Sequence, residues 1–398
     1  MNTQFEPGAP PPSADYVPLC IPELRGNEWA YIKECLDTGW VSSVGSYVDR
    51  FEADLARYVG IQHAVAVVNG TAAIHIALLV AGIQPEDEVL VSTMTFIAPV
   101  NAIRYAGAWP VLIDSDAVTW QMDPQQVAEF LEKECETRSG SLWNRHTGRR
   151  VRAIMPVHIL GHPVDMHPIM ELARRYDLIV IEDATESLGA RYKEQMTGCI
   201  GDIACFSFNG NKIITTGGGG MLVTNRQDWA EKARYLTTQA KDDRLEFIHN
   251  EIGFNYRLTN VQAAMGVAQL EQLEAYIAVK RRIAAAYDAA FQAVPGLILM
   301  PDAPWAYSIK WMYTILVDED VYGMDSRALL RKLREARIET RPLWQPAHLC
   351  PAHRQAYAMP CPVAERLKRQ AISLPCSVGL TDAQQQRVIE LVRVNSAG

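Results

Sequence analysis

The sequence predicts an α/β protein with a large domain, built on a mostly parallel sheet of seven strands, and a smaller C-terminal α+β domain. The chain has 398 residues, more than one core of ~100 to 200 residues needs. From residue 63 to about 225, short Val/Ile/Leu-rich runs alternate with helical stretches, a pattern typical of parallel strands joined by crossover helices. A long helical stretch then ends at Pro295-Gly296, where we expect the large domain to end.

The elements follow in chain order. Helices are expected at 27–36 and 47–59, separated by the Gly- and Ser-rich loop 39–45, which could line a pocket. The seven expected strands are 63–69, 88–93, 109–114, 151–157, 178–183, 203–208 and 221–224. They predict one large sheet.

The second half of the chain is predicted to be helical at 258–294 and to continue as the smaller domain. That domain is expected to contain a strand at 311–317, a helix at 326–336, a strand at 338–341 and a final helix at 381–394. We therefore divide the chain into a flexible leader (1–16), a large domain (17–295) and a small domain (296–398).

Composition narrows the class of function. The net charge is −8 and the basic residues are scattered, which argues against a nucleic-acid partner. No run of about 18 apolar residues could span a bilayer. The eight cysteines lack C-x-x-C spacing, and the leader has acidic residues and prolines but no apolar signal region. We expect reduced thiols and a cytoplasmic protein.

Gly70-Thr71-Ala72 lies where an apolar strand turns into a helix. Free N–H groups and the positive end of the helix would face one point there, which suits an anion. The alternative is an ordinary turn in which Thr71 is the N-cap residue.

Asp183 ends a buried strand, at the edge where open α/β sheets bind their ligands. It could pair with a ring nitrogen, although an acid in this place is also often a helix cap or part of a structural ion pair.

Lys212 follows another apolar strand and precedes Gly217–Gly220, so a lysine is held on a shaped loop. Such surroundings suit a Schiff-base lysine, whose neutral amine attacks a carbonyl. The glycines could instead form a phosphate cradle or a plain turn, but their spacing matches neither the P-loop nor the dinucleotide-binding motif.

His158, His162 and His167 raise the question of a metal site, since imidazole is a common ligand. The segment contains Gly and Pro, so helical ligand spacing fails, and we expect structural histidines and no metal.

Together these motifs resemble the DegT/StrS nucleotide-sugar aminotransferases, which are fold-type I pyridoxal-phosphate enzymes, over about residues 17–394. Ser207, Phe208, Lys212 and Gly217–Gly220 match the family's Ser-Phe-x-x-x-Lys motif and its Gly-rich turn. The resemblance implies an aspartate-aminotransferase-like fold and a pyridoxal 5'-phosphate cofactor, alternating with the pyridoxamine form. It also implies that Ser207 binds the phosphate and that Lys212 holds the cofactor as a Schiff base.

Further cofactor contacts are implied by the same resemblance. Gly70, Thr71 and Ala72 match the family's phosphate cup, and Thr95-Phe96 matches a pair whose aromatic ring stacks on the cofactor. Asp183 matches the partner of the ring nitrogen.

Two other positions carry implications of their own. Glu186 stands where many members carry a Gln that binds the ring hydroxyl, a departure shared by a subset of the family. Asn255 matches an Asn that reaches the phosphate in the neighbouring subunit, which implies a homodimer with shared active sites.

The implied reaction moves an amino group from L-glutamate to a keto sugar nucleotide. Segments 38–45, 209–211 and 238–241 look most like the branch that makes 4-amino sugars for legionaminic acid and bacillosamine. The expected acceptor is the 4-keto group of a UDP- or GDP-linked 2-acetamido-2,6-dideoxyhexos-4-ulose. The substrate contacts suggested by position in relatives, each of which could equally be structural, are Ser42, Ser43, Lys241, Arg341 and His348.

Three alternatives stay open. The acceptor could be another keto sugar nucleotide, of the perosamine type or with a 3-keto group. A sugar dehydratase of the same fold is disfavoured because those enzymes replace the lysine with His, whereas Lys212 is present here. A non-catalytic regulator is disfavoured by the acidic chain, which has no recognisable DNA-binding motif.

Overall fold

The computed structural model describes residues 15–243 and 245–394. Most of the leader predicted at 1–16 lies outside the described residues. Near the start of the described chain, Val17 pairs with Ile338 in an isolated parallel bridge.

All seven predicted strands form and belong to one sheet, which has ten strands within the described residues. The seven are β1 (His63–Val67), β2 (Glu88–Ser92), β3 (Trp109–Ile113), β6 (Arg150–Met155), β7 (Ile179–Asp183), β10 (Ile203–Ser207) and β11 (Gly220–Thr224). The order along the sheet is β1-β11-β10-β7-β6-β2-β3, with short β15 (Tyr357–Ala358) at the far edge. Because β11 is antiparallel to both β1 and β10, the other six predicted strands run in one direction.

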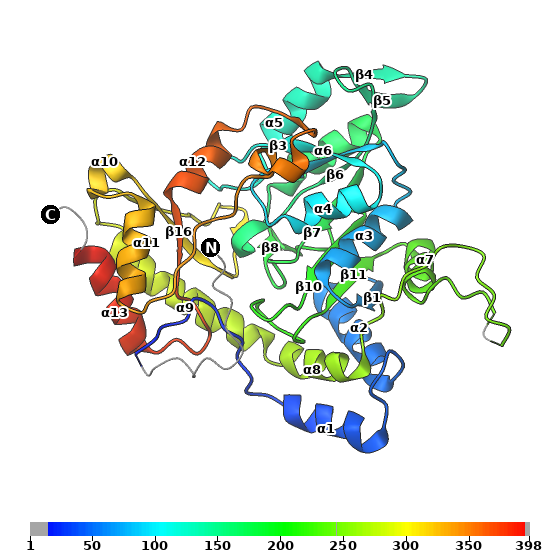
Figure 1. Cartoon of the computed structure of the whole chain (residues 1–398), viewed down its shortest axis with the longest axis horizontal. Helices are drawn as coiled ribbons and strands as arrows, with labels where there is room; N and C mark the ends of the chain where they lie inside the picture. Colours follow the sequence, from blue (N-terminus) through cyan, green and yellow to red (C-terminus); the bar gives the residue numbers. More distant parts are fainter. Residues whose placement is uncertain (1–14, 244, 395–398) are drawn as a thin grey trace.

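The strands are apolar along their whole length because both faces of the sheet are covered. In β2, Val89 and Val91 pack into one hydrophobic cluster, together with Ile74 of α3 (Gly70–Val80). Leu90 points the other way and packs into a second cluster, together with Ile169 of α6 (Met166–Tyr176). The remaining helices around this sheet are α4 (Ala98–Tyr105), α5 (Pro124–Glu129), the π-helix Phe130–Glu134 and α7 (Gln227–Thr237). Figure 1 shows these helices packed around the sheet.

Three strands of the sheet were not predicted. β4 (Cys135–Arg138) and β5 (Ser141–Asn144) form an edge hairpin rich in polar residues, which lacks the apolar signal of a central strand. β15 has two residues and pairs with β3 from far along the chain, so no local pattern announces it. A separate small sheet consists of β13 (Ala306–Tyr307), β8 (Arg191–Tyr192) and β9 (Gln195–Met196).

The predicted N-terminal helices form as α1 (Glu28–Thr38) and α2 (Ser46–Val59). The helix predicted at 258–294 is instead two helices, α8 (Asn260–Leu270) and α9 (Leu273–Phe291), with a short turn between them. A capping box fixes the start of α8, where the Thr259 side chain accepts the Gln262 N–H and the Gln262 side chain reaches back.

The C-terminal part contains a three-stranded sheet of β12 (Leu297–Leu299), β14 (Tyr313–Val317) and β16 (Ala371–Leu374). Its helices are α10 (Glu319–Tyr322), α11 (Ser326–Glu335), α12 (Pro362–Gln370) and α13 (Asp382–Val394), with 3-10 turns at Ala347–Leu349 and Pro351–His353. The strand predicted at 338–341 is wrong, because Ile338 and Arg341 make only isolated bridges, to Val17 and Ser373 respectively. The domain boundary at 295 stays a prediction. Across 15–243 and 245–394, no helix is long and apolar enough to cross a membrane.

Candidate active site

A pocket of about 360 Å³ lies at the carboxyl edge of the sheet, where β1, β7 and β10 end. Seven predicted site residues line it, namely Gly70, Thr71, Phe96, Asp183, Glu186, Ser207 and Lys212. The other lining residues are Asn69, Ile74, Thr95, Ala98, Pro99, Thr185, Asn209, Asn211, Trp311 and Trp344. Parallel strands bring these distant segments together because their carboxyl ends share one edge.

One end of the pocket is the start of α3. Asn69 is extended and its side chain accepts the Ala72 N–H at 2.8 Å, so Asn69 is the N-cap and the alternative with Thr71 as the cap is wrong. The Ala72 N–H is therefore occupied, and Ala72 itself is buried. The N–H groups of Gly70 and Thr71 belong to the first turn, which has no intrahelical partners for them.

Gly70 is required by close packing at this end. A Cβ at Gly70 would lie 2.8 Å from Cβ of Ser207 and 3.2 Å from Cγ2 of Thr185. The helix start, the Ser207 hydroxyl and Thr185 thus surround one small space. Hydroxyls and free N–H groups at the positive end of a helix suit a phosphate.

We predict that Gly70→Ala weakens pyridoxal-phosphate binding roughly 10- to 100-fold, because the new methyl group must displace Ser207 from the cradle. The dissociation constant can be measured by absorbance titration of the apoprotein. Gly210→Ala is the matched control, since a Cβ there meets nothing within 4 Å. Equal affinity of the two variants would contradict the assignment.

Asp183 is buried at the end of β7 and accepts the Thr185 N–H at 3.1 Å. Burial raises the pKa of its carboxyl, and the Thr185 hydrogen bonds and the charge on Lys212 oppose that rise. An ionised Asp183 is thus favoured by a cationic partner in the pocket.

Lys212 and Glu186 lie beside each other in the pocket. The Lys212 Nζ lies 3.6 Å from Oε1 of Glu186 and 4.2 Å from the centre of the Trp311 ring, and its side chain is 12% exposed. Oε2 of Glu186 accepts the Leu160 N–H at 2.9 Å, while burial raises the pKa of this carboxyl. Leu160 adopts φ 60°, a left-handed conformation that aims its N–H at the acid.

These residues fit a flat, phosphate-bearing aldehyde such as pyridoxal phosphate. The pocket offers an anion cradle at Gly70 and Ser207, a buried acid at Asp183 and an amine at Lys212. Phe96 stands in the wall with 54% of its surface exposed, which leaves a ring face free for stacking.

The predicted substrate residues lie outside this pocket. Arg341 pairs with Glu339 at 2.6 Å, and the His348 Nδ1 lies 2.8 Å from the Thr93 hydroxyl. Neither side chain lines the cavity.

The remaining predicted contacts are also elsewhere. Ser42 accepts the Asn260 N–H through its carbonyl at 2.6 Å, and Ser43 follows it on the loop before α2. Lys241 and Asn255 are exposed, on and beside the extension after α7 that projects from the body in Figure 1. The Lys241 Nζ lies 4.7 Å from the Phe247 ring, and Asn255 pairs with Thr238 through an isolated bridge.

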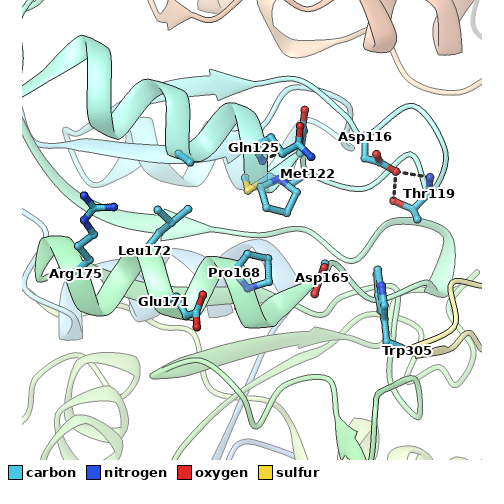
Figure 2. A pocket seen from close by; sticks show the side chains of 13 residues that line it. Asp116, Thr119, Met122, Gln125, Asp165, Pro168, Glu171, Leu172, Arg175 and Trp305 are labelled. Carbon is cyan, nitrogen blue, oxygen red and sulfur yellow. Dashed lines mark hydrogen bonds between the residues drawn. The ribbon is translucent and has the colours of Figure 1, made fainter.

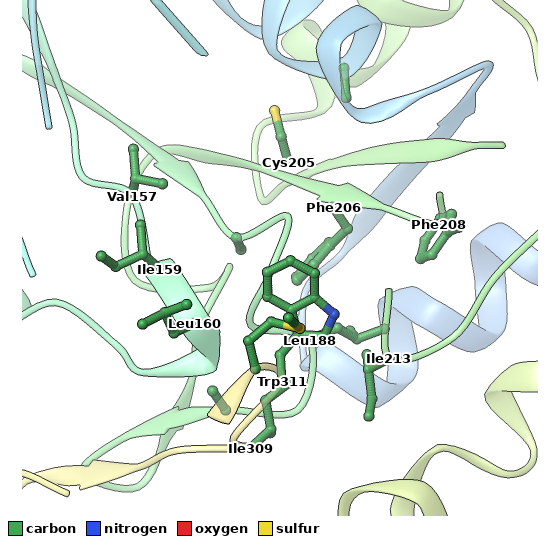
Figure 3. Close-up of a cluster of buried hydrophobic side chains, with 14 of the residues drawn as sticks. Val157, Ile159, Leu160, Leu188, Cys205, Phe206, Phe208, Ile213, Ile309 and Trp311 are labelled. Carbon is green, nitrogen blue, oxygen red and sulfur yellow. The ribbon is translucent and has the colours of Figure 1, made fainter. Parts of the chain in front are cut away.

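Sequence reasoning missed Thr185, Trp311 and Trp344 as pocket residues. Trp311 was expected to begin a strand, whereas β14 begins at Tyr313 and Trp311 packs beneath Lys212. Figure 3 shows Trp311 among Leu188, Ile213 and Ile309, in the apolar layer under the site. No local pattern places Trp344 there.

The three histidines have structural partners. The His158 Nε2 lies 3.0 Å from Glu182, and exposed His167 lies 3.1 Å from Glu171. The His162 Nδ1 lies 2.8 Å from the Pro163 carbonyl, while its Nε2 lies 3.2 Å from the Ala303 N–H. In the described part of the chain, no group of three or more His, Cys, Asp or Glu residues is placed to hold a metal ion.

His162 should make stability depend on pH. Burial lowers its pKa from 6.5 to about 4, so the unfolded chain binds the proton more tightly between these values. The free energy of unfolding should therefore fall by about 2 kcal/mol through His162 as the pH falls from about 7 to about 5. Denaturant titrations should show a flatter pH profile for His162→Gln but not for the exposed control His167→Gln. An unchanged slope in His162→Gln would show that this group is not responsible.

A wider pocket of about 670 Å³ lies between α5 and α6 (Figure 2). Its carboxylates are engaged locally: Asp116 accepts from Thr119, and Asp165 accepts the Tyr192 hydroxyl at 2.6 Å. It contains none of the predicted site residues, so size alone does not identify the active site.

Solved structures with this architecture define a class of protein, the fold-type I pyridoxal-phosphate aminotransferases. The crystal structure of DesV from S. venezuelae superposes with a TM-score of 0.82 at 33% identity, covering 92% of this chain and 94% of DesV. The chain belongs to the DegT/DnrJ/EryC1/StrS aminotransferase family, whose model matches residues 22–393.

Two curated relatives are GDP-perosamine synthases. That of Caulobacter vibrioides is 40% identical over 94% of this chain and 96% of its own length. That of Escherichia coli O157:H7 is 39% identical over 95% of this chain and 98% of its own length. The chain is accordingly a pyridoxal-phosphate-dependent sugar aminotransferase, as its sequence predicts, while the legionaminic acid and bacillosamine branch gains no support.

Proposed function

We propose that this chain transfers the amino group of L-glutamate to the 4-keto group of a GDP-linked 6-deoxyhexose, giving a perosamine-type amino sugar. The observation that carries the proposal is the match to two GDP-perosamine synthases over nearly the full length of all three chains. These relatives favour an acceptor without the 2-acetamido group over the acetylated acceptor that the sequence first suggested.

The pocket supports the following roles. Gly70, Thr71 and Ser207 would hold the cofactor phosphate, and Phe96 would stack on the ring. Ala72 supports the cup from within α3, since its N–H is held by Asn69. Asp183 would face the ring nitrogen, whose positive charge would be the partner that a buried carboxylate requires.

Pyridoxal phosphate supplies an electron sink that stabilises the carbanion left when an amino acid loses its α-proton. The protein's part is to move that proton. The Lys212 Nζ takes it from the donor substrate and later returns a proton to the sugar carbon. Glu186, 3.6 Å away, orients the amine, and Trp311 shields it from water on one side.

A substrate panel tests the acceptor. Purified holoenzyme with L-glutamate is offered a GDP-linked 4-keto-6-deoxyhexose and a UDP-linked 2-acetamido-2,6-dideoxyhexos-4-ulose, and kcat/KM is measured from 2-oxoglutarate release. We expect the GDP sugar to be preferred by roughly 100-fold or more. Preference for the acetylated sugar would return the function to the other branch.

We further propose a homodimer in which Asn255 of one subunit completes the phosphate site of the other. Asn255 is exposed and lies outside its own chain's pocket, as a residue that serves a partner would. Lys241 and the Ser42-Ser43 loop are also on the surface and are proposed to meet the sugar nucleotide across the interface. Arg341 and His348 are assigned structural roles through Glu339 and Thr93. The eight free thiols fit the cytoplasm.

Mixing two inactive variants tests the shared site. A doubly tagged dimer of Lys212→Ala with Asn255→Glu should recover about half of wild-type activity, because one site collects both defects and the other collects none. Co-expression with two tags isolates the mixed dimer, and a wild-type dimer prepared in the same way is the control. A mixed dimer as inactive as its parents would rule the shared site out.

A further inference from the structure

A buried lysine and two thiols lie directly beneath the Lys212 loop and have no part in the transamination proposed above. Lys280 of α9 is 2% exposed, and its Nζ donates to the Trp311 carbonyl at 2.8 Å. The same Nζ lies 3.4 Å from Sγ of Cys20 and 3.6 Å from Sγ of Cys376. One ammonium group thus faces two sulfur atoms.

The two cysteines come from opposite ends of the chain but lie side by side. The Cys376 N–H donates to the carbonyl of Leu19, the residue before Cys20, at 2.8 Å. Both sulfur atoms also lie beside the same Lys280 Nζ, at 3.4 and 3.6 Å. Paired backbones and sulfur atoms that share one neighbour bring the two side chains together, as a disulfide requires.

The two thiols differ in reactivity. The neighbouring Cys376 thiol and the charge on Lys280 lower the pKa of Cys20 to about 6 against the opposing effect of burial, which favours the thiolate form of Cys20. Cys20 is partly accessible, whereas Cys376 is 1% exposed. The neighbouring Cys20 thiol and burial raise the pKa of Cys376. An accessible nucleophile beside a protected second thiol is the arrangement of a redox-active pair.

The pair also contacts the catalytic loop. The Cys20 Sγ lies 3.5 Å from the Asn211 carbonyl oxygen, and the Trp311 Nε1 donates to the same oxygen at 2.8 Å. Asn211 precedes Lys212, whose Nζ lies over the Trp311 ring. A change at Cys20 therefore affects both the Asn211 carbonyl and the Trp311 ring, which hold the Lys212 side chain in position.

We propose that Cys20 and Cys376 are an oxidation site at which a disulfide forms and thereby displaces the Lys212 side chain from its position in the pocket. Closure turns the Cys20 sulfur toward Cys376 and removes its contact with Asn211. It also removes both sulfur atoms from contact with the Lys280 Nζ, which donates a hydrogen bond to the Trp311 carbonyl.

The chemistry requires a peroxide as oxidant. The Cys20 thiolate attacks one oxygen of hydrogen peroxide, so that an S–O bond forms, the O–O bond breaks and the departing hydroxide takes a proton to become water. The Cys376 sulfur then attacks the Cys20 sulfur, an S–S bond forms, the S–O bond breaks, and the hydroxide leaves as water with the Cys376 proton. Two thiols are oxidised and one peroxide is reduced.

The first test is chemical and independent of the sugar substrate. Holoenzyme is treated with limiting hydrogen peroxide, remaining thiols are alkylated, and non-reduced peptides are mapped by mass spectrometry. We expect a Cys20–Cys376 linked peptide, the loss of two of the eight thiols, and reversal by dithiothreitol. The proposal of a disulfide would be overturned if Cys20 were found only as an oxygen adduct, if it were cross-linked to Lys280, or if no thiol changed.

The second test addresses the link to Lys212. Oxidation should slow transamination roughly tenfold or more, because small displacements of a reacting group are costly. Cys20→Ser should keep its rate under the same peroxide dose, because it lacks the thiol that reacts first, while Cys199→Ser should lose activity as wild type does. Cys199 is a matched control, since it is also partly accessible but burial raises the pKa of its thiol to about 11. A disulfide that forms without any change in rate would overturn the link while leaving the oxidation site in place.

Discussion

Lys212→Ala should abolish turnover, with a loss of at least ~10⁴-fold in kcat, because one amine serves both to hold the cofactor and to move the proton. Among the described residues that line the pocket, Lys212 is the one lysine. Glu186 and Asp183 cannot replace it, since a carboxylate forms no Schiff base. Steady-state release of 2-oxoglutarate measures the loss.

Two controls accompany this variant. Lys193→Ala removes an exposed lysine outside the pocket and should leave kcat unchanged. Borohydride reduction of wild-type holoenzyme, followed by peptide mapping, should mark Lys212 alone. Normal multiple turnover by Lys212→Ala, or a mark on another lysine, would remove the basis for the assignment.

Asp183→Asn should lower kcat by roughly 10²- to 10³-fold while cofactor occupancy changes much less. The amide keeps the shape of the side chain, and its oxygen can still accept the Thr185 N–H. What is lost is the negative charge that stabilises a protonated ring nitrogen. Absorbance of the bound cofactor gives the occupancy, and the kcat of the same preparation gives the rate.

Asp177→Asn is the matched control for this substitution. Its side chain is fully exposed, and its left-handed φ of 53° is a conformation that Asn also adopts readily. It should behave as wild type. If Asp183→Asn also stays within a few-fold of wild type, the charge at this position has no catalytic part.

The sequence predicts the central sheet well because its strands are buried on both faces, which makes them continuous apolar runs. The same reasoning fails at the polar strands β4 and β5, and at 338–341, where an apolar residue pairs with the N-terminal segment rather than joining a sheet. The break between α8 and α9 is hidden because the polar turn residues Glu271 and Gln272 are also good helix formers.

For the site, the motifs single out Gly70, Asp183 and Lys212, which do line one pocket, while their roles stay predictions. They miss Trp311 and Trp344, which reach the pocket from the C-terminal part of the chain through tertiary packing alone. The motifs also do not identify the acceptor substrate, because the surface residues 42–43 and 241 lie outside the pocket of their own chain.

The most direct test of the account follows the nitrogen atom itself. Wild-type holoenzyme is incubated with L-glutamate carrying a heavy nitrogen isotope and a GDP-linked 4-keto-6-deoxyhexose, and the sugar nucleotide is analysed by mass spectrometry and NMR. The account predicts that the heavy nitrogen appears on carbon 4 of the sugar, in equal amount to the 2-oxoglutarate released, and that Lys212→Ala yields none. Heavy nitrogen retained in glutamate, with the keto sugar unchanged or dehydrated, would contradict it.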